Sequence, residues 1–122
     1  MILADTSVWI DHLRSDDGQL RALLNEGRIA IHPFIIAELA LGSLKNRTAT
    51  LALLDFLPQV RVAQLGEVRQ MIEARRLYSL GIGLTDAHLI ASVLISAPTQ
   101  LWTREKPLRK AAERLGIDSA LA

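Results

Sequence analysis

The sequence predicts an α/β fold built around a short parallel sheet. Two observations support this class. Short apolar segments alternate with longer segments in which apolar residues recur at helical spacing. The first apolar segment, Met1–Ala4, runs directly into an acidic residue, Asp5, as a buried strand does when it delivers a side chain to the edge of a sheet. Strands that alternate with helices favour parallel pairing, so we expect helices on both faces of the sheet.

The predicted strands are short and mostly apolar. They are expected at Ile2–Ala4, Arg28–Ile31, Val60–Ala63 and Gln100–Thr103. A further segment, Ile117–Leu121, is either a last edge strand or a tail. No repeat, low-complexity tract or linker interrupts this order.

The predicted helices follow from apolar periodicity and from residues that start or stop helices. They are expected at Ser7–Leu13, around residues 20–24, and at Phe34–Leu41, Thr48–Phe56, Glu67–Leu80, Asp86–Ile95 and Lys106–Leu115. Thr6 or Ser7 is expected to cap the first helix, and Thr85 is expected to cap the helix that begins at Asp86. Pro33 opens the third helix, because proline is tolerated in a first turn. The helix from Asp86 is apolar nearly all round, which predicts that it is buried.

Composition limits the class of protein. At 122 residues the chain is expected to form one domain, residues 1–122. It has no cysteine, which excludes disulfides, thiolate metal sites and cysteine nucleophiles. The N-terminus lacks the basic region of a signal peptide, and the longest apolar run, Leu89–Ala97, is too short to cross a membrane. We therefore expect a soluble cytoplasmic protein, and the net charge of +1 means that an anionic partner needs a local basic patch.

Four of the thirteen acidic residues are harder to explain as ordinary surface charges. Asp5 and Glu105 follow predicted strands, at the end of the strand where ligands bind in open parallel sheets. Asp86 begins the buried helix. Each also has a simpler explanation: Asp5 as a helix cap, and Asp86 and Glu105 as first-turn acids that favour the helix dipole.

Glu38 is the acid that local sequence explains least. Its helical neighbours three and four positions away are Phe34, Ile35, Leu41 and Gly42, and none of them can pair with a carboxylate. On a buried helix, an unpaired carboxylate costs several kcal/mol. The sequence therefore predicts a distant partner for Glu38, either an arginine or a bound cation.

Together these acids predict a metal site. Two strand-end acids, Asp5 and Glu105, and one helix-start acid, Asp86, are expected at one edge of the parallel sheet, and the helix that carries Glu38 begins at that edge. Four carboxylates that lie together need cations, and Mg²⁺ or Mn²⁺ prefers such oxygen ligands. The absence of cysteine and of paired histidines argues against zinc. Such a site is suited to phosphodiester hydrolysis.

Four segments carry a resemblance to a known family: DTSVWIDHLR at the start, HPFIIAEL around Glu38, GIGLTDAHLIAS around Asp86 and LWTREKPL near the end. In this order they resemble a PIN domain, and more narrowly the VapC-type toxins of bacterial type II toxin–antitoxin systems. The resemblance covers the whole chain. It implies a PIN-like three-layer α/β/α fold around a short central parallel sheet. It also implies a Mg²⁺- or Mn²⁺-dependent endoribonuclease that cuts structured RNA, often transfer RNA or ribosomal RNA.

The resemblance also implies partners. A cognate antitoxin is expected to lay its tail across the toxin and block the site. The toxins commonly form homodimers, and pairs of them join antitoxin dimers that bind operator DNA, so DNA is contacted only through the antitoxin.

Residue by residue, Asp5, Glu38 and Asp86 match the three core acids of the family. Glu105 falls where a fourth acid, usually Asp, is found. Its side chain is one methylene longer, so it is expected to bind metal through water or to assist a second ion. Thr103 matches a frequent Ser or Thr near the site, and this hydroxyl or that of Thr6 is expected to hold a metal-bound water.

RNA also requires cations near the site. The candidates are four residues close to the predicted acidic edge: Arg14, Arg104, Lys106 and Arg109. Trp9 is either a core residue or a contact for an antitoxin tail or a second subunit.

Two other functions are compatible with the same fold. One is a PIN-fold nuclease that processes RNA and has no antitoxin. The other is an inactive PIN module that binds RNA or protein, which the four acids argue against. A flavodoxin-like phosphoacceptor domain would need paired acids after the first strand and a late lysine, and neither pattern is present.

Overall fold

A three-stranded parallel sheet in the order β2-β1-β3 forms the centre of the computed structural model, which describes all residues 1–122. The strands are β1 (Ile2–Ala4), β2 (Ile29–Ala30) and β3 (Gln100–Trp102). Leu3 pairs with Ala30 on one side and with Leu101 on the other. All three residues of β1 are buried although successive side chains point to opposite faces, so both faces of the sheet are covered. The predicted α/β class is confirmed.

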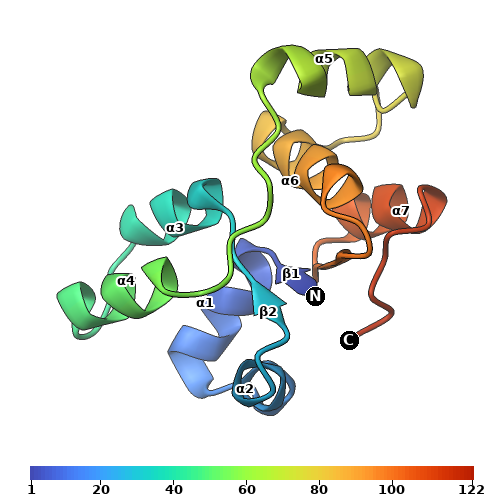
Figure 1. Cartoon of the computed structure of the whole chain (residues 1–122). Coiled ribbons are helices and arrows are strands. Elements are labelled where there is room, and N and C mark those ends of the chain that lie inside the picture. The colour runs from blue at the N-terminus through green and yellow to red at the C-terminus, as the bar shows by residue number, and fades with distance from the viewer.

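Seven helices surround the sheet, as predicted (Figure 1). They are α1 (Thr6–Ser15), α2 (Gly18–Asn25), α3 (Pro33–Ala40), α4 (Arg47–Asp55), α5 (Leu65–Ala74), α6 (Leu84–Ile95) and α7 (Lys106–Arg114). Seven residues of α6 are buried, which confirms its predicted central position. Helices α3 and α4 form one side of the molecule in Figure 1, and α5 packs on α6 on the other.

One hydrophobic cluster of 24 buried residues, most of them aliphatic, joins the sheet to the helices around it. Trp102 is fully buried in β3, as expected, and Trp9 of α1 is only 4% exposed. Trp9 is therefore a core residue in this structure. Its side chain offers no free surface to a partner.

The predicted strand Val60–Ala63 is wrong. Pairing with β2 stops at one bridge between Ile31 and Gln59, and the Val60 amide donates to the Ile31 carbonyl at 3.1 Å. Beyond it the Ala63 amide donates to the hydroxyl of Ser92, and the Arg61 amide donates to that of Ser96. Ser92 of α6 and Ser96, the C-cap residue of this helix, thus take the hydrogen bonds that a neighbouring strand would make. At the other edge of the sheet, a bridge between Leu101 and Asp118 shows that the C-terminal segment is a minimal edge strand.

Three predicted helix ends are also wrong. Asp5, not Thr6 or Ser7, caps α1. Helix α6 begins one residue before Thr85, and its cap residue is Gly83. Helix α5 ends at Ala74 instead of Leu80, because the chain turns at Arg76, where φ is 54°.

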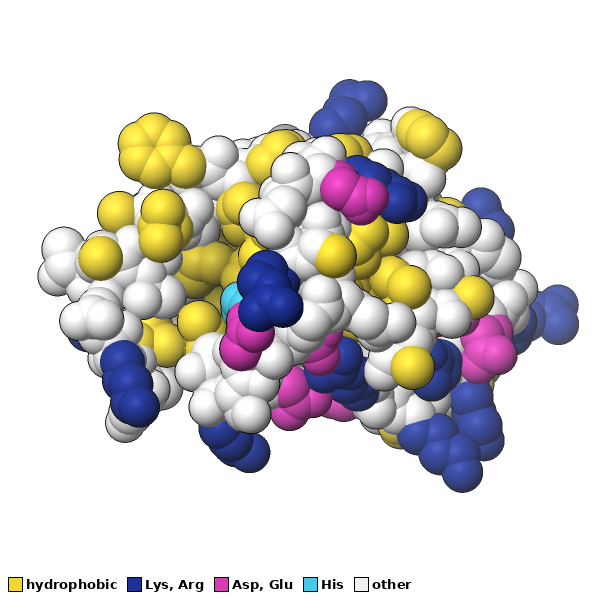
Figure 2. All heavy atoms as spheres, turned by 90° about the horizontal axis from the view of Figure 1, so that it is seen from below, with side chains coloured by type: hydrophobic (Ala, Val, Ile, Leu, Met, Phe, Trp, Pro, Cys, Tyr) yellow, Lys and Arg dark blue, Asp and Glu magenta, His cyan; other side chains and the backbone are white.

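The surface is uneven. Figure 2 views the molecule from below, and hydrophobic side chains gather at the end that carries α3 and α4, whereas acidic and basic side chains mix over the rest. Leu41, Leu53 and Phe56 are 90%, 70% and 87% exposed at this end. None of the seven helices has the length and apolar character that a membrane crossing needs.

Candidate functional site

The four predicted acids come from four elements around one edge of the sheet. Asp5 directly follows β1, and Glu105 lies three residues after the end of β3 and precedes α7. Asp86 lies in the first turn of α6, and Glu38 lies on α3. Since β1 and β3 are parallel neighbours, their carboxyl ends, and with them Asp5 and Glu105, lie at the same edge.

Asp5 is the fixed point of this site. It is only 2% exposed, and both of its carboxylate oxygens accept hydrogen bonds. The amide and the hydroxyl of Ser7 donate to Oδ1 at 3.0 and 2.5 Å, and the hydroxyl of Thr103 donates to Oδ2 at 2.7 Å. Burial raises the pKa of Asp5, and the hydrogen bonds from Ser7 and Thr103 act in the opposite direction. Asp5 is thus both a helix cap and a buried, preorganised carboxylate.

The two hydroxyls that hold Asp5 also hold the loop between β3 and α7. Ser7 Oγ accepts a hydrogen bond from the Arg104 amide, and Thr103 Oγ1 accepts one from the Glu105 amide, each at 3.1 Å. Asp5 and the backbone at Glu105 are therefore fixed relative to each other. Sequence reasoning identified Thr103 but missed Ser7, whose only signal was its place two residues after an acid that caps a helix.

The side chain of Glu38 was predicted to be buried without a local partner. It is exposed, so this prediction is wrong. One side of α3 faces solvent, where Ala37 and Leu41 are also exposed. Glu38 does have a partner that the sequence did not suggest, because the hydroxyl of Thr6 donates to Glu38 Oε1 at 2.7 Å. This bond ties α3 to the residue next to Asp5.

Electrostatics connects Asp86 and Glu105 to the other two acids. Asp86 is half-buried and accepts a hydrogen bond from the Gly83 amide at 3.3 Å. Burial raises its pKa, and the negative charges of Asp5 and Glu38 raise it further. The pKa of Glu105 is also raised, by burial first and then by the charges of Asp5, Asp86 and Glu38. Glu105 therefore lies within the field of the other three carboxylates, and Asp86 lies within the field of Asp5 and Glu38.

The oxygen donors fit a hard divalent cation, although no three of them lie close enough together to hold one in this arrangement. Like charges keep carboxylates apart when no cation is between them. Asp5 is fixed, whereas the side chains of Glu38 and Glu105 are exposed. By its chemistry, the set of carboxylate oxygens suits Mg²⁺ or Mn²⁺.

Comparisons with known proteins agree with this geometry. The model of the PIN domain family matches residues 2–114. This chain belongs to the PIN-domain family. It is 45% identical over 117 residues to two curated proteins named Ribonuclease VapC32, from the CDC 1551 / Oshkosh and the ATCC 25618 / H37Rv strains of Mycobacterium tuberculosis. The match covers 96% of this chain and 94% of each relative. The predicted resemblance to VapC-type PIN domains, and with it the three-layer fold, is confirmed.

The predicted RNA-binding cations of this PIN domain differ in their surroundings. The guanidinium of Arg104 pairs with Asp11 and Asp17 at 2.7 and 2.5 Å, and its Nε donates to the Ala122 carbonyl. These acids raise the pKa of Arg104, although its partial burial acts against them. Arg109 donates to the carbonyl of Leu121. Both arginines therefore anchor the C-terminal segment.

The other two candidates, Arg14 and Lys106, are exposed, and neither side chain makes an ion pair or a hydrogen bond. They are the cations of the predicted set that are free to meet a phosphate. The two threonine hydroxyls are in a different position, because Thr6 and Thr103 already donate their protons to Glu38 and Asp5.

Proposed function

We propose that this PIN domain is a Mg²⁺- or Mn²⁺-dependent endoribonuclease and the toxin of a type II toxin–antitoxin module, neutralised by a cognate antitoxin. The observation that carries the proposal is the set of four carboxylates around the carboxyl edge of the sheet, where Asp5 is held by three hydrogen bonds and Asp86 and Glu105 lie in the field of the other acids. The name of the relatives, ribonucleases of the VapC type, supports the same activity.

Each site residue has a distinct proposed role. Asp5, Glu38, Asp86 and Glu105 hold the metal, and Asp5 is the ligand whose position is fixed in advance. A bound divalent ion supplies Lewis-acid activation of the scissile phosphate and of a water molecule. Thr103 orients Asp5, and Thr6 orients Glu38, through the hydrogen bonds described above.

The proposed substrate is RNA, with transfer or ribosomal RNA as the favoured class. Arg14 and Lys106 are the best-supported phosphate contacts, because their side chains have no other partner. Arg104 and Arg109 would have to release the C-terminal segment to take this role.

We also propose that residues 1–122 form one PIN domain that acts in the cytoplasm. The proposed partners are the antitoxin, a second copy of the chain in a homodimer, and a toxin–antitoxin hetero-oligomer that reaches operator DNA through the antitoxin. The VapC name of the relatives supports the antitoxin, and the homodimer, the hetero-oligomer and the contact with DNA are what the resemblance to VapC-type toxins implies.

Cleavage of RNA by the purified chain tests the proposal. We expect cleavage of transfer RNA with Mg²⁺ or Mn²⁺ and none after EDTA. Glu38→Gln should reduce the rate by about a hundredfold or more, since it removes a metal ligand at an exposed position without disturbing the core. Asp5→Asn and Asp86→Asn should have similar effects, and Glu105→Ala a smaller one.

The control is Glu113→Gln, which changes an exposed, unpaired glutamate on α7 by the same chemistry. It should cleave like the wild type. Full activity in Glu38→Gln would refute the carboxylate site. Expression without an antitoxin separates the two nuclease alternatives, because a toxin arrests growth and an RNA-processing enzyme does not. An intact chain that binds RNA or protein without cutting RNA would instead be the inactive module.

A further inference from the structure

Arg104 adjoins the acidic site, which consists of the four proposed metal ligands Asp5, Glu38, Asp86 and Glu105. It lies in the loop between β3 and α7, with Thr103 before it and Glu105 after it. The Thr103 hydroxyl donates to Asp5, whereas the Arg104 side chain is bound to residues of α1 and the start of α2. The Arg104 backbone is fixed as well, because its amide donates to Ser7 Oγ at 3.1 Å. A displacement of Arg104 would therefore move site residues on either side of it.

Every nitrogen atom of the Arg104 guanidinium has a partner. Nη1 donates to Asp11 Oδ2 at 2.7 Å, Nη2 donates to Asp17 Oδ2 at 2.5 Å, and Nε donates to the Ala122 carbonyl at 3.0 Å. The guanidinium also lies over the ring of Trp102, with Cζ 5.3 Å from the ring centroid. The side chain is only 23% exposed, so water screens these ion pairs less than it screens pairs on an open surface. The guanidinium is therefore held in one place.

Asp17 is a firm partner because α2 holds it in turn. Its Oδ1 accepts a hydrogen bond from the Leu20 amide at 3.0 Å and so caps α2, which leaves Oδ2 for Arg104. The bond from Leu20 lowers the pKa of Asp17, burial acts against it, and the bond and the charge of Arg104 lower it further. Asp17 therefore stays ionised at neutral pH and connects the β3–α7 loop to the start of α2.

The same contacts keep the charge of Arg104 away from the acidic site. Arg104 pairs with Asp11 and Asp17, and no ion pair joins it to Asp5 or Glu105. Without these partners, an arginine next to Glu105 would be a counter-ion for the carboxylates and would compete with a metal ion for them. Asp11 and Asp17 thus leave the acidic site open to another cation.

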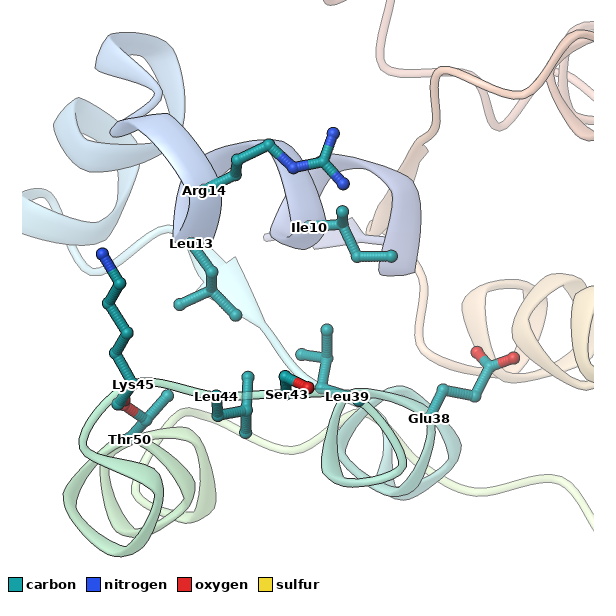
Figure 3. A pocket seen from close by; sticks show the side chains of 10 residues that line it. Ile10, Leu13, Arg14, Glu38, Leu39, Ser43, Leu44, Lys45 and Thr50 are labelled. Carbon is teal, nitrogen blue, oxygen red and sulfur yellow. The ribbon is translucent and has the colours of Figure 1, made fainter.

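Arg14 shows the surroundings of a cation that is free to meet a phosphate. Its guanidinium lies over Ile10, and it lines a pocket of about 520 Å³ that Glu38 also lines (Figure 3). It makes no ion pair or hydrogen bond. Before Arg104 could contact a phosphate, it would have to leave two carboxylates and the Ala122 carbonyl. The geometry therefore argues against Arg104 as a contact for RNA.

We propose that Arg104 is a positioning residue of the acidic site and not a phosphate contact. Its guanidinium fixes the β3–α7 loop to α1 and α2, so that Thr103 and Glu105 stay beside Asp5. This inference rests on the proposed metal-dependent function. It goes beyond that function in one respect: an arginine, which as a cation repels metal ions, is required for the site to bind one.

The test is Mn²⁺ binding by the full chain, measured by isothermal titration calorimetry without RNA. Arg104→Gln removes a positive charge near a cation site, so Coulomb's law alone predicts tighter binding of Mn²⁺. We expect the opposite, because the loop loses its anchor. The dissociation constant should rise about tenfold, as is typical when residues that orient metal ligands are changed. An equal or lower dissociation constant would overturn the proposal.

Arg104→Lys tests the same role at unchanged charge, and it keeps the proposal testable if Arg104→Gln does not fold. A lysine ammonium is a point charge on a flexible stem, so it cannot bind Asp11, Asp17 and the Ala122 carbonyl in the geometry of the planar guanidinium. The dissociation constant for Mn²⁺ should rise several-fold. Binding as tight as in the wild type would show that Arg104 acts through its charge alone, against the proposal.

RNA binding in EDTA separates positioning from phosphate contact. The probe is a fluorescein-labelled single-stranded RNA of random sequence, and its anisotropy is measured over a series of salt concentrations. Arg104→Gln should leave the slope of log K against log salt as in the wild type. A slope that is smaller in magnitude by about 0.7 would identify a lost phosphate contact and would refute the inference.

The matched control is Arg21→Gln, which removes an arginine of α2 that pairs with Asp16 in the turn before this helix. Because this ion pair does not involve the β3–α7 loop, Mn²⁺ should bind as in the wild type. Thermal unfolding in EDTA checks that each variant is folded. A wild type that binds no Mn²⁺ refutes the proposed metal site itself. A wild type that binds Mn²⁺ no more tightly than folded Arg104→Gln refutes only the role of Arg104.

Discussion

His32 combines two structural tasks in one buried side chain. Its Nδ1 accepts a hydrogen bond from the Phe34 amide at 3.0 Å and so caps α3, the helix that carries Glu38. Nε2 therefore carries the proton and donates it to the hydroxyl of Ser92, 3.1 Å away. Burial, with a smaller contribution from the charge of His88, lowers the pKa of His32 to about 4. A second proton on the ring would occupy Nδ1 and break the cap.

The first prediction concerns acid stability. Between pH 6.5 and 4 the unfolded chain protonates His32 and the folded chain does not, so the free energy of unfolding falls as the pH falls through this range. The stability that neutral His32 contributes is fully present above about pH 6.5. By linkage, the free energy of unfolding is lower by about 3 kcal/mol at pH 4. Urea unfolding of the wild type and of His32→Asn at pH 7 and pH 4.5 measures it.

Asparagine can still cap the helix but does not titrate. His32→Asn should be less stable than the wild type at pH 7, and the difference should shrink at pH 4.5. Carboxylates with raised pKa values, such as Asp86, change stability with pH in both proteins, so their effect cancels in this comparison. An equal difference at the two pH values would contradict the assignment.

At the scale of elements, the site depends on how the start of α1 is joined to the start of α7. Ser7 and Thr103 each donate a hydroxyl proton to one oxygen of Asp5 and accept a backbone amide of the β3–α7 loop. Two short polar side chains thus set the separation of two strand ends that come from opposite ends of the chain. This link is what holds the Glu105 backbone beside Asp5.

The second prediction concerns Ser7, one of the two residues that make this link. Ser7→Ala leaves the Arg104 amide without its acceptor and frees one side of Asp5, and should cost about 1 kcal/mol of unfolding free energy. We expect kcat for RNA cleavage to fall about tenfold, with an unchanged KM, because Ser7 positions Asp5, a proposed metal ligand, and has no proposed contact with RNA. Rescue of kcat in Ser7→Thr is expected, since the hydroxyl is kept.

Ser15→Ala is the matched control, because this serine lies at the other end of the same helix, is exposed and makes no side-chain hydrogen bond. It should leave both quantities unchanged. An effect of Ser7→Ala on stability alone would show that Ser7 is structural and does not position Asp5 for the reaction.

The elements that the sequence predicted well are those with strong local signals. β1 and α7 lie within a residue of their predicted bounds, since an uninterrupted apolar run and an i, i+3, i+4, i+7 pattern depend on local residues alone. The predicted strand Val60–Ala63 failed because hydroxyls of Ser92 and Ser96, some thirty residues away, take its amides. Nothing in the segment itself carries that information.

In the site, too, features with a local signal were predicted and features that depend on distant residues were missed. Three of the acids, Asp5, Asp86 and Glu105, were predicted from their places after strands or at a helix start, and the parallel pairing of β1 and β3 puts Asp5 and Glu105 at one edge of the sheet. The reasoning about Glu38 failed in its premise, because an apolar helix need not be buried on every side. Ser7 and the Thr6–Glu38 bond were missed, since a side chain that reaches across 32 residues leaves no pattern at short range.

At the scale of the whole molecule, the chain gathers negative charge at one place in its fold. The acids come from positions 5, 38, 86 and 105, so complete folding is required to bring them together. The raised pKa values of Asp86 and Glu105 mean that their ionisation opposes folding at neutral pH. On the proposed function, a cation held by these carboxylates would reverse this cost, because it would bind the folded chain and not the unfolded one.

The last prediction follows from the cost of ionising Asp86 in the folded chain. Without metal, Asp86→Asn should unfold at the same temperature as the wild type or a higher one, because it removes a charge that the site disfavours and keeps an oxygen for the Gly83 amide. With Mn²⁺ at about a hundred times its dissociation constant, the wild type should gain about 2.7 kcal/mol, which is roughly 10 °C in Tm. Asp86→Asn should gain much less, and Glu113→Gln should behave like the wild type in both conditions. Thermal unfolding of the three proteins, each with EDTA and with Mn²⁺, gives the six melting temperatures to compare. If Mn²⁺ raised the Tm of the wild type and Asp86→Asn equally, the ion would bind elsewhere, and the carboxylates at the sheet edge would not be its ligands.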